Sequence, residues 1–356
     1  MNEPRPPAAE EQLSFLRSLQ RLLDEGSFVA SYKFALLHAI ADLCVLKGDD
    51  SGSELELLTS EIAEQFVRLY WRQAAPFVAG DSREVLKQNT GRQAAVVRDV
   101  AEHHNRYHGS LAELKKSSSD WIHLRRKVER TVKVMPLWKL QTVGSERLEF
   151  LYENSDAGGI VRLKPGVAYC FRAFHPMITD MLEGAWLHFV QRCNPRLLGQ
   201  VIDLRSFLFG VRRSSLSKFG RLLRDVQEGS CFYCGRGVTA GGAVDHFIPW
   251  RQYPLDLGHN LVLAHKRCNS SKADLLAAEE HLDRWAERTH ARRDELEEGF
   301  EQRKILFDWP ATRRVAHWAY GQVHRAGGQV WVRAKMLRPL SDEWARILSA
   351  EGRPAA

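Results

Sequence analysis

Apolar residues in the first part of the chain recur at helical spacing. Five leucines between Leu13 and Leu23 stand a few positions apart along one helix face, and Gly26 follows at the predicted helix end. Residues 30–48 are apolar nearly throughout, which predicts a more buried second helix. Residues 60–77 predict a third helix that is rich in aromatic side chains. The pattern therefore predicts a helical beginning.

The pattern becomes strand-like after Pro136. Residues 82–134, which precede it, are more polar and predict further helices. Beyond it lie three short segments rich in valine, leucine and aromatic residues and separated by turns that contain glycine: residues 137–143, 147–153 and 159–171. They predict a small antiparallel sheet. Residues 175–193 then predict a strongly apolar helix, which Pro195 ends.

A basic segment over residues 201–229 follows. Ser214 or Ser215 can start a helix in this segment, with one packing face formed by Leu216, Phe219, Leu222, Leu223 and Val226. The segment carries six basic side chains: Arg205, Arg212, Arg213, Lys218, Arg221 and Arg224. These side chains either grip a phosphate backbone or form an ordinary solvated face, and both interpretations stay open.

The predicted fold class is α+β, in three parts. A mainly helical domain with a small antiparallel sheet is expected over residues 1–200, and a second domain over residues 201–275. A helical C-terminal extension is expected over residues 276–356. In this extension residues 278–305 mix both signs of charge, which predicts one long helix. The extension is expected to fold back onto one of the preceding domains.

The composition adds a charge argument. The formal net charge is +7 and the sequence pI is about 9.1, which favours a polyanionic partner. No apolar run approaches the roughly 20 residues that span a bilayer, and the N-terminus lacks the pattern of a secretory signal. A cytoplasmic protein without a membrane segment is therefore expected. Cys44, Cys170 and Cys193 stand alone in apolar surroundings and are expected to be buried thiols.

The remaining cysteines belong to two short pairs of potential metal ligands. A structural zinc site takes four nitrogen or sulfur ligands in a tetrahedron, commonly from two short turns. A C-x-x-C pair and an H-x-x-C pair with the same spacing supply such a set, and a small segment gains folding energy from the metal. His259 is an alternative fourth ligand, but it lacks the matching spacing. The predicted zinc ligands are Cys231, Cys234, His265 and Cys268.

A second polar set lies between these pairs and just after them. Asp245 and His246 stand side by side at the end of a short apolar strand. Hydrolysis of a phosphodiester needs a base for water and a cation for the developing charge. Histidine ordinarily titrates near neutral pH and suits the first task. The oxygens of Asp245 and Asn269 suit Mg²⁺ or Mn²⁺. Asn260 is expected to accept a hydrogen bond from the His246 ring, and Lys272 to place a positive charge near the scissile phosphate.

These residues carry a family resemblance. Cys-x-x-Cys, then VDHFIP, then HNLVLAHKRCN and SSK resemble the HNH endonuclease family, whose core is the zinc-stabilised ββα-metal fold. The resemblance spans about residues 229–275. It implies His246 as the general base, Asp245 and Asn269 as Mg²⁺ ligands and Asn260 as the orienting residue. The chain departs from the pattern with Asn269 in place of a histidine and with His265 where many members have cysteine.

The flanking stretches FGRLLRDVQEGSCFYCG and PWRQYPLDLGHN are similar to stand-alone bacterial HNH nucleases of restriction or phage defence. That resemblance implies DNA as substrate and an N-terminal domain that recognises DNA, a protein partner or a signal. Symmetric double-strand cleavage would imply a homodimer. The side chains expected to contact nucleic acid are Lys272, Arg221, Arg224 and Arg251.

Two alternatives to a DNA endonuclease remain open at the level of sequence. One is a catalytically silent, zinc-dependent module that binds nucleic acid. Asp245, His246, Asn260 and Asn269 argue against it, because binding alone does not require that set. The other is an HNH nuclease that acts on RNA, since the core site contacts a phosphodiester rather than a sugar.

Overall fold

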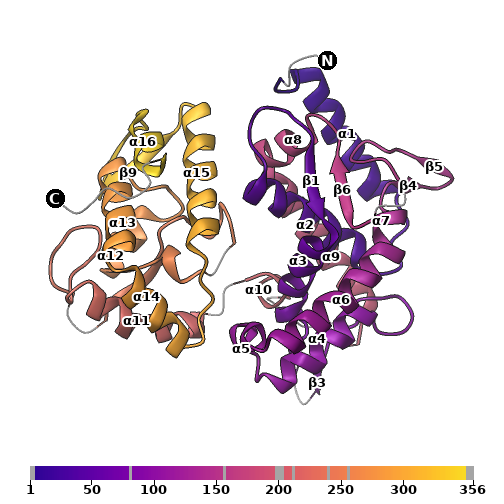
Figure 1. The fold of residues 1–356 in the computed structure, drawn as a ribbon, viewed down its shortest axis with the longest axis horizontal. Helices are drawn as coiled ribbons and strands as arrows, with labels where there is room; N and C mark the ends of the chain where they lie inside the picture. The colour runs from indigo at the N-terminus through magenta and orange to yellow at the C-terminus, as the bar shows by residue number, and fades with distance from the viewer. Residues whose placement is uncertain are drawn as a thin grey trace. The chain divides into compact units, whose positions relative to one another are not determined.

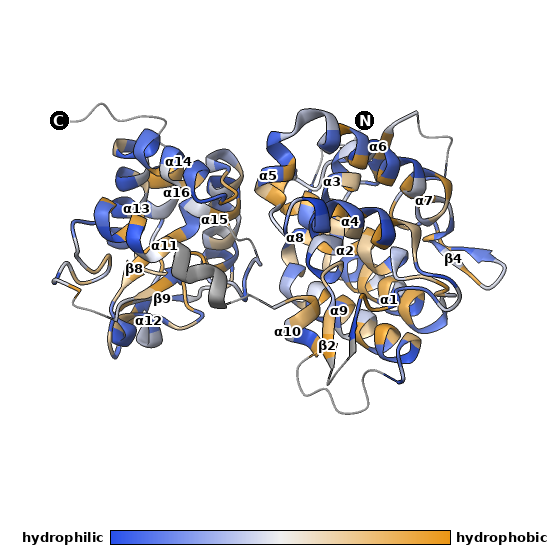
Figure 2. Ribbon diagram, turned by 90° about the horizontal axis from the view of Figure 1, so that it is seen from below, coloured by the Kyte–Doolittle hydropathy of each residue, from blue (hydrophilic) through white to orange (hydrophobic). Residues whose placement is uncertain are grey.

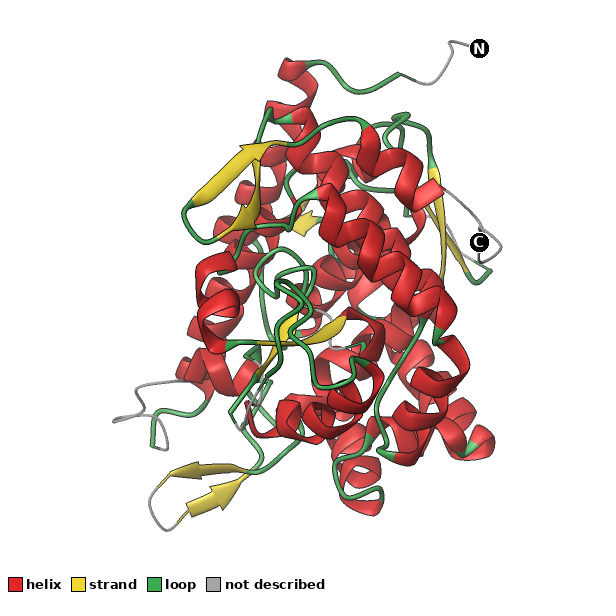
Figure 3. Ribbon diagram, turned by 90° about the vertical axis from the view of Figure 1, so that its left-hand side faces the viewer, coloured by secondary structure: helices red, strands yellow, loops and turns green. Residues whose placement is uncertain are grey.

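The chain folds into two compact units, Met1–Gly210 and Val211–Ala356. The structure is a computed structural model that describes residues 5–79, 82–154, 158–196, 204–210, 213–238, 241–254 and 257–349. Helices make up most of both units, and the strands form two-stranded antiparallel sheets (Figures 1 and 3). The predicted boundaries at residues 200 and 275 stay predictions, although residues 276–349 share the second unit with the segment before them.

The first unit is built around one buried helix, α2. The residues from Lys33 to Leu46 in this helix are all buried, because an apolar pattern on every face allows neighbours on every side. It packs against α3, α8 and α9. The helices of this unit are α1 (Ala9–Glu25), α2 (Tyr32–Lys47), α3 (Thr59–Gln73), α4 (Ala95–Arg106), α5 (Leu111–Lys116), α6 (Ser118–Val134), α7 (Pro136–Lys139), α8 (Val167–Ala173), α9 (His175–Cys193) and α10 (Leu204–Leu208).

The small sheet of the first unit differs from the prediction. The strand β6 (Ile160–Leu163) pairs antiparallel with β1 (Leu55–Leu58), far away in the sequence. The segment after Pro136 also carries the helix α7, the short hairpin of β4 (Thr142–Val143) and β5 (Glu146–Arg147), and an isolated antiparallel bridge between Tyr152 and Leu163. A further hairpin joins β2 (Phe77–Ala79) and β3 (Ser82–Glu84).

The expectation of a strand over the end of residues 159–171 was wrong. Gly166 adopts a left-handed conformation with φ of 80°, and the helix α8 begins at the next residue. Val167, Ala168, Cys170 and Phe171 are buried on one side of that helix. Their spacing fits the helical period, so the apolar composition favoured a strand where the positions favoured a helix.

The second unit contains a two-stranded sheet followed by a short helix. The strand β7 (Ala243–His246) pairs antiparallel with β8 (Leu261–Ala264), and the helix α12 (Lys266–Lys272) follows directly. The remaining elements are α11 (Arg213–Val226), the 3-10 turn η1 (Gly258–Asn260), α13 (Glu279–Ala291), α14 (Arg293–Gln302), α15 (Trp309–Arg325), β9 (Gln329–Arg333), β10 (Met336–Pro339) and α16 (Glu343–Ser349). The strands β9 and β10 form a second hairpin.

The single long helix expected over residues 278–305 is two helices. The helix α13 ends before Arg292, whose backbone leaves the helical region with φ of −117°, and α14 begins at the next residue. The break lets Trp285 on one helix and Phe300 on the other both be fully buried. Figure 2 shows hydrophilic and hydrophobic residues alternating along these helices. Tertiary packing therefore overrode a charge pattern that was compatible with one straight helix.

Among the described residues, no helix combines the length and the apolar character that crossing a membrane requires.

Candidate metal centre and reaction site

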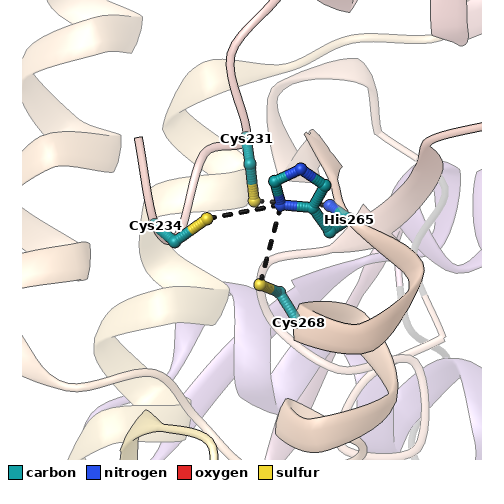
Figure 4. A group of neighbouring side chains, drawn as sticks. All are labelled: Cys231, Cys234, His265 and Cys268. Atoms are coloured by element: carbon teal, nitrogen blue, oxygen red, sulfur yellow. Dashed lines mark hydrogen bonds between the residues drawn. The ribbon is translucent and has the colours of Figure 1, made fainter. Parts of the chain in front are cut away.

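Four predicted zinc ligands converge in the second unit. One ligand atom each from Cys231, Cys234, His265 and Cys268 lies within 4.8 Å of all the others (Figure 4). The Sγ of Cys234 lies 3.3 Å from Nδ1 of His265, and that of Cys268 lies 4.0 Å from the same atom. Three sulfurs and one nitrogen at this separation form a donor set that fits a tetrahedral zinc ion.

The His265 ring is oriented so that Nδ1 faces the sulfurs. Its Nε2 donates to the carbonyl oxygen of Gly237 at 3.1 Å. Because a carbonyl can only accept, this bond leaves the lone pair on Nδ1, as metal-bound histidines usually arrange. His259, the alternative ligand, is fully buried beside Phe300 and Trp309 instead. Burial and the charges of nearby arginines lower the pKa of His259 to about 3.

The cysteines of this cluster affect one another's pKa values. Burial and the neighbouring Cys231 and Cys234 sulfurs raise the pKa of Cys268 to about 12. For Cys234, burial opposes ionisation, but hydrogen bonds from the Arg236 backbone and the other ligands outweigh it and lower the pKa to about 7. A divalent cation relieves this conflict because it stabilises every thiolate at once.

Asp245 and His246 lie at the end of β7, as predicted. Their register partners on β8 are Val262 and Leu261, and His246 is the last residue of the strand. Both side chains are mostly buried, with Asp245 8% and His246 7% exposed. The ring of His246 lies 5.4 Å from that of Trp250, a neighbour that the sequence analysis did not identify.

Asn260 acts on the backbone rather than in the predicted way. Its Oδ1 accepts a hydrogen bond from the backbone N–H of Ile248 at 2.8 Å, and its Nδ2 donates to the carbonyl of the same residue at 3.0 Å. The backbone N–H of Phe247 also donates to the carbonyl of Asn260 at 2.7 Å. Asn260 thus clamps the turn directly after His246. The expected bond to the imidazole is replaced by this clamp.

Lys272 is placed differently from the expectation. It is the last residue of α12, and its side chain is 0% exposed. Its Nζ donates to the backbone carbonyl of His246 at 3.0 Å and lies 3.2 Å from Oδ2 of Asp245. The predicted contact with a phosphate finds no support in this geometry, because the ammonium already has two partners inside the unit.

Tyr233 is the residue of this site that the sequence analysis missed. Its hydroxyl donates to Oδ2 of Asp245 at 2.5 Å, and its side chain is buried. The residue stands inside the C-x-x-C pair, between Cys231 and Cys234. A tyrosine held by two zinc ligands was the available signal, but its partner lies on another segment and could not be read from spacing.

Asp245 and Asn269 have side-chain oxygens that could act as ligands for a hard cation. The Tyr233 hydroxyl and the Lys272 ammonium both approach Oδ2 of the Asp245 carboxylate, and no described residue donates a hydrogen bond to Oδ1. Asn269 follows the ligand Cys268 on α12, and its side-chain amide likewise bonds to no described residue. A carboxylate oxygen and an amide oxygen are ligands that fit Mg²⁺ or Mn²⁺.

The arginines predicted to contact nucleic acid lie in different surroundings. Arg221 is exposed, whereas Arg224 is partly buried and donates to the carbonyl of Val238 at 2.6 Å. Arg251 is 76% exposed and lies 3.8 Å from Asp274. Arg212 and the side chains of two further predicted basic residues, Arg213 and Lys218, lie outside the described residues. Exposure therefore leaves Arg221 and Arg251 accessible to a ligand.

The C-terminal helices bind the backbone of the site. Trp285 donates through Nε1 to the carbonyl of His259 at 2.9 Å. Arg288 donates to the carbonyls of His259 and Leu261 at 3.3 and 3.2 Å. Arg284 donates to the carbonyl of Phe232, inside the cysteine pair, at 2.7 Å. Residues 276–349 therefore hold in place the segment that carries the site.

Comparison with protein families locates two matches. Residues 12–204 match the family described as Domain of unknown function (DUF8808), and this match spans more than half of the chain. The chain belongs to the DUF8808 family. Residues 231–275 match the HNH endonuclease family, which confirms the resemblance inferred from the motifs. No curated protein and no solved structure matches the chain.

The HNH domain indicates a metal-binding nuclease, and with it binding of nucleic acid. The Cys₃His cluster indicates structural zinc. Of the matched segment, residues 243–246, 261–264 and 266–272 form the two strands and the helix described above.

Proposed function

We propose that this DUF8808 protein is a Mg²⁺- or Mn²⁺-dependent endonuclease that hydrolyses phosphodiester bonds in DNA. One observation carries the proposal. Asp245 and His246 stand together at a strand end that the Asn260 clamp and the Lys272 ammonium fix from two sides. A module that only binds nucleic acid does not need an imidazole and a carboxylate held in this way.

The residues divide the work of hydrolysis between them. A ring nitrogen of His246 accepts the proton of the attacking water. General-base catalysis of this kind raises the rate by roughly 10²–10⁴-fold. Lys272 holds the backbone of His246 by donating a hydrogen bond to the His246 carbonyl, and Asn260 holds the turn after His246. Asp245 and Asn269 would hold the cation. When bound, such a cation neutralises charge that builds on the phosphate and on the leaving oxygen.

A plasmid assay tests the catalytic part of the proposal. Supercoiled DNA with the full-length protein and Mg²⁺ should become nicked or linear, and EDTA should prevent this. His246→Ala should lower the rate by roughly 10²–10⁴-fold with zinc content unchanged. His290→Ala, an exposed histidine on α13, is the matched control and should cut normally. Equal cutting by His246→Ala would show that the base is assigned wrongly.

The same assay separates the alternatives. A shift of DNA on a gel without turnover in any divalent metal would instead support the silent binding module. Cleavage of RNA but not DNA would change the substrate. Light scattering of the protein with and without DNA tests the homodimer that symmetric double-strand cutting implies.

We further propose a role in restriction or phage defence, in which the DUF8808 unit recognises DNA, a protein partner or a signal. The charge of +7 and the exposed Arg221 and Arg251 support a polyanionic ligand. Bacteria that express the wild-type chain should resist phage plating better than bacteria that express His246→Ala. Equal plaque numbers across a broad phage panel would remove the defence role and leave the nuclease proposal intact.

A further inference from the structure

We propose that Tyr233 is a positioning residue that couples the zinc knuckle to the catalytic cation, by fixing which oxygen of Asp245 the cation can reach. The inference rests on the proposed nuclease function, because it concerns the cation that Asp245 would hold there.

The first step is the division of the Asp245 carboxylate. The Tyr233 hydroxyl donates to Oδ2 at 2.5 Å, and the Lys272 ammonium lies 3.2 Å from the same oxygen. Oδ1 accepts no hydrogen bond from any described residue. Two donors on one oxygen fix the rotation of the carboxylate about its Cβ–Cγ bond. A cation bound at this position would then be held through Oδ1.

The second step is the rigidity of Tyr233. The residue lies between two zinc ligands, so a bound zinc ion holds its backbone on both sides. Its ring packs edge-on against Trp331 at 5.2 Å and His281 at 5.5 Å, both from the C-terminal part of the unit. Trp331 in turn donates to the hydroxyl of Ser271, the neighbour of Lys272, at 3.0 Å. Both the backbone and the ring of Tyr233 are therefore held in place.

Tyr233 would therefore link the structural zinc site to the site of the catalytic cation. Zinc fixes the knuckle, the knuckle fixes the phenol, and the phenol orients Oδ1. Outer partners of this kind typically change metal affinity or activity by about 10–100-fold when they are removed. The phenol touches neither substrate nor cation, so its loss should weaken binding of the cation more than it lowers the rate once the cation is bound.

The test compares Tyr233→Phe with Tyr320→Phe in the full-length protein. Tyr320 is also fully buried in this unit, and its hydroxyl donates to the carbonyl of Ala277, so its variant loses a similar bond outside the reaction site. Binding of Mn²⁺ to the DNA-free protein is measured from the loss of the free-ion signal in electron paramagnetic resonance. Zinc content and circular dichroism establish that each variant is folded.

Tyr233→Phe should bind Mn²⁺ about 10-fold more weakly and need about 10-fold more Mg²⁺ for half-maximal nicking. Saturating Mg²⁺ should restore most of its rate. Tyr320→Phe should match the wild type in both measurements. Wild-type Mn²⁺ affinity in a folded, zinc-loaded Tyr233→Phe would overturn the inference.

Asp245→Asn provides a second test if Tyr233→Phe does not fold. The two donors should draw its amide oxygen into the position of Oδ2, which turns the amide NH₂ toward the cation. Mn²⁺ binding should then be lost while zinc remains. Unchanged Mn²⁺ binding would show that Oδ1 is not the ligand. A wild-type protein that binds Mn²⁺ through this arrangement but cuts no nucleic acid would instead refute the nuclease function alone.

Discussion

Asp42 of the first unit and Asp245 of the second are both buried among charged or hydrogen-bonding partners, and the two arrangements differ in one respect. In the first unit Asp42 contacts His38 through Oδ2 at 3.3 Å and His175 through Oδ1 at 2.9 Å. In the second unit both partners of Asp245 share Oδ2. A carboxylate with both oxygens occupied by the protein serves the fold. A carboxylate with one oxygen left over can also serve a ligand.

The surroundings strengthen this contrast. Asp42 lies on the fully buried helix α2, and His38 also faces Glu183 at 3.9 Å. Every partner of this cluster comes from the helical core of the DUF8808 unit. The partners of Asp245 come from the zinc knuckle and from the end of α12. The first cluster is therefore held by apolar packing, whereas the second lies beside the predicted zinc site.

Removal of zinc should have the largest effect and should act on the second unit alone. Structural zinc contributes about 10–16 kcal/mol of apparent binding energy in small domains, which is comparable with the total stability of a domain. Prolonged chelation, or Cys268→Ser, should make the second unit sensitive to protease while the first stays resistant. Cys193→Ser, a thiol of the first unit outside the cluster, is the control. A zinc-free chain with an intact second unit would contradict this.

Asp42→Ala should destabilise the first unit by about 3–5 kcal/mol, because it removes the nearer carboxylate of the buried His38 and leaves only Glu183, 3.9 Å away. Asp24→Ala, at an exposed position, should change stability by less than about 0.5 kcal/mol. Urea denaturation of the full-length variants measures both. If Asp42→Ala melts like the wild type, the closed cluster is not structural, and the contrast with Asp245 fails.

Arg288→Ala should destabilise the second unit by about 1–3 kcal/mol, because the carbonyls of His259 and Leu261 lose the hydrogen bonds that Arg288 donates. Nicking should slow as the Asn260 clamp loosens, and Arg288→Lys should recover part of the loss. Arg346→Ala, at an exposed arginine of α16, should have neither effect. A full rate in Arg288→Ala would show that the C-terminal helices do not hold the site.

The last expected effect is a pH dependence of the stability of the first unit. Burial lowers the pKa of His38, but Asp42 and Glu183 outweigh burial and raise it from 6.5 to about 10. The folded state then binds this proton more tightly than the unfolded chain. Its contribution is complete below pH 6.5 and is lost as the pH rises to about 10.

Asp42 shows the opposite sign. Burial raises its pKa, but the two histidines outweigh burial and hold it well below 3.8, so its contribution is lost only as the pH falls below that value. Denaturation of the full-length chain between pH 6 and pH 10 measures the His38 effect. In His38→Gln this slope should disappear. A slope that is unchanged in His38→Gln would assign it to another group.

Several features followed from the sequence because they depend on neighbours along the chain. The helix predicted over residues 175–193 has these bounds in the structure. The four zinc ligands come from two turns, and the span of a C-x-x-C or H-x-x-C turn is fixed by covalent geometry. The position of Asp245 and His246 at a strand end followed from the apolar residues before them and Pro249 after them.

Other features required the tertiary structure because their partners are distant in sequence. The pairing of β1 with β6 and the break between α13 and α14 depend on which surfaces meet. The burial of Lys272 depends on α12 lying against the end of β7. Spacing could only predict Asp245 as a ligand for a metal. Only the contacts of Tyr233 and Lys272 decided which of its oxygens remains for one, because hydrogen bonds between segments form where packing places them.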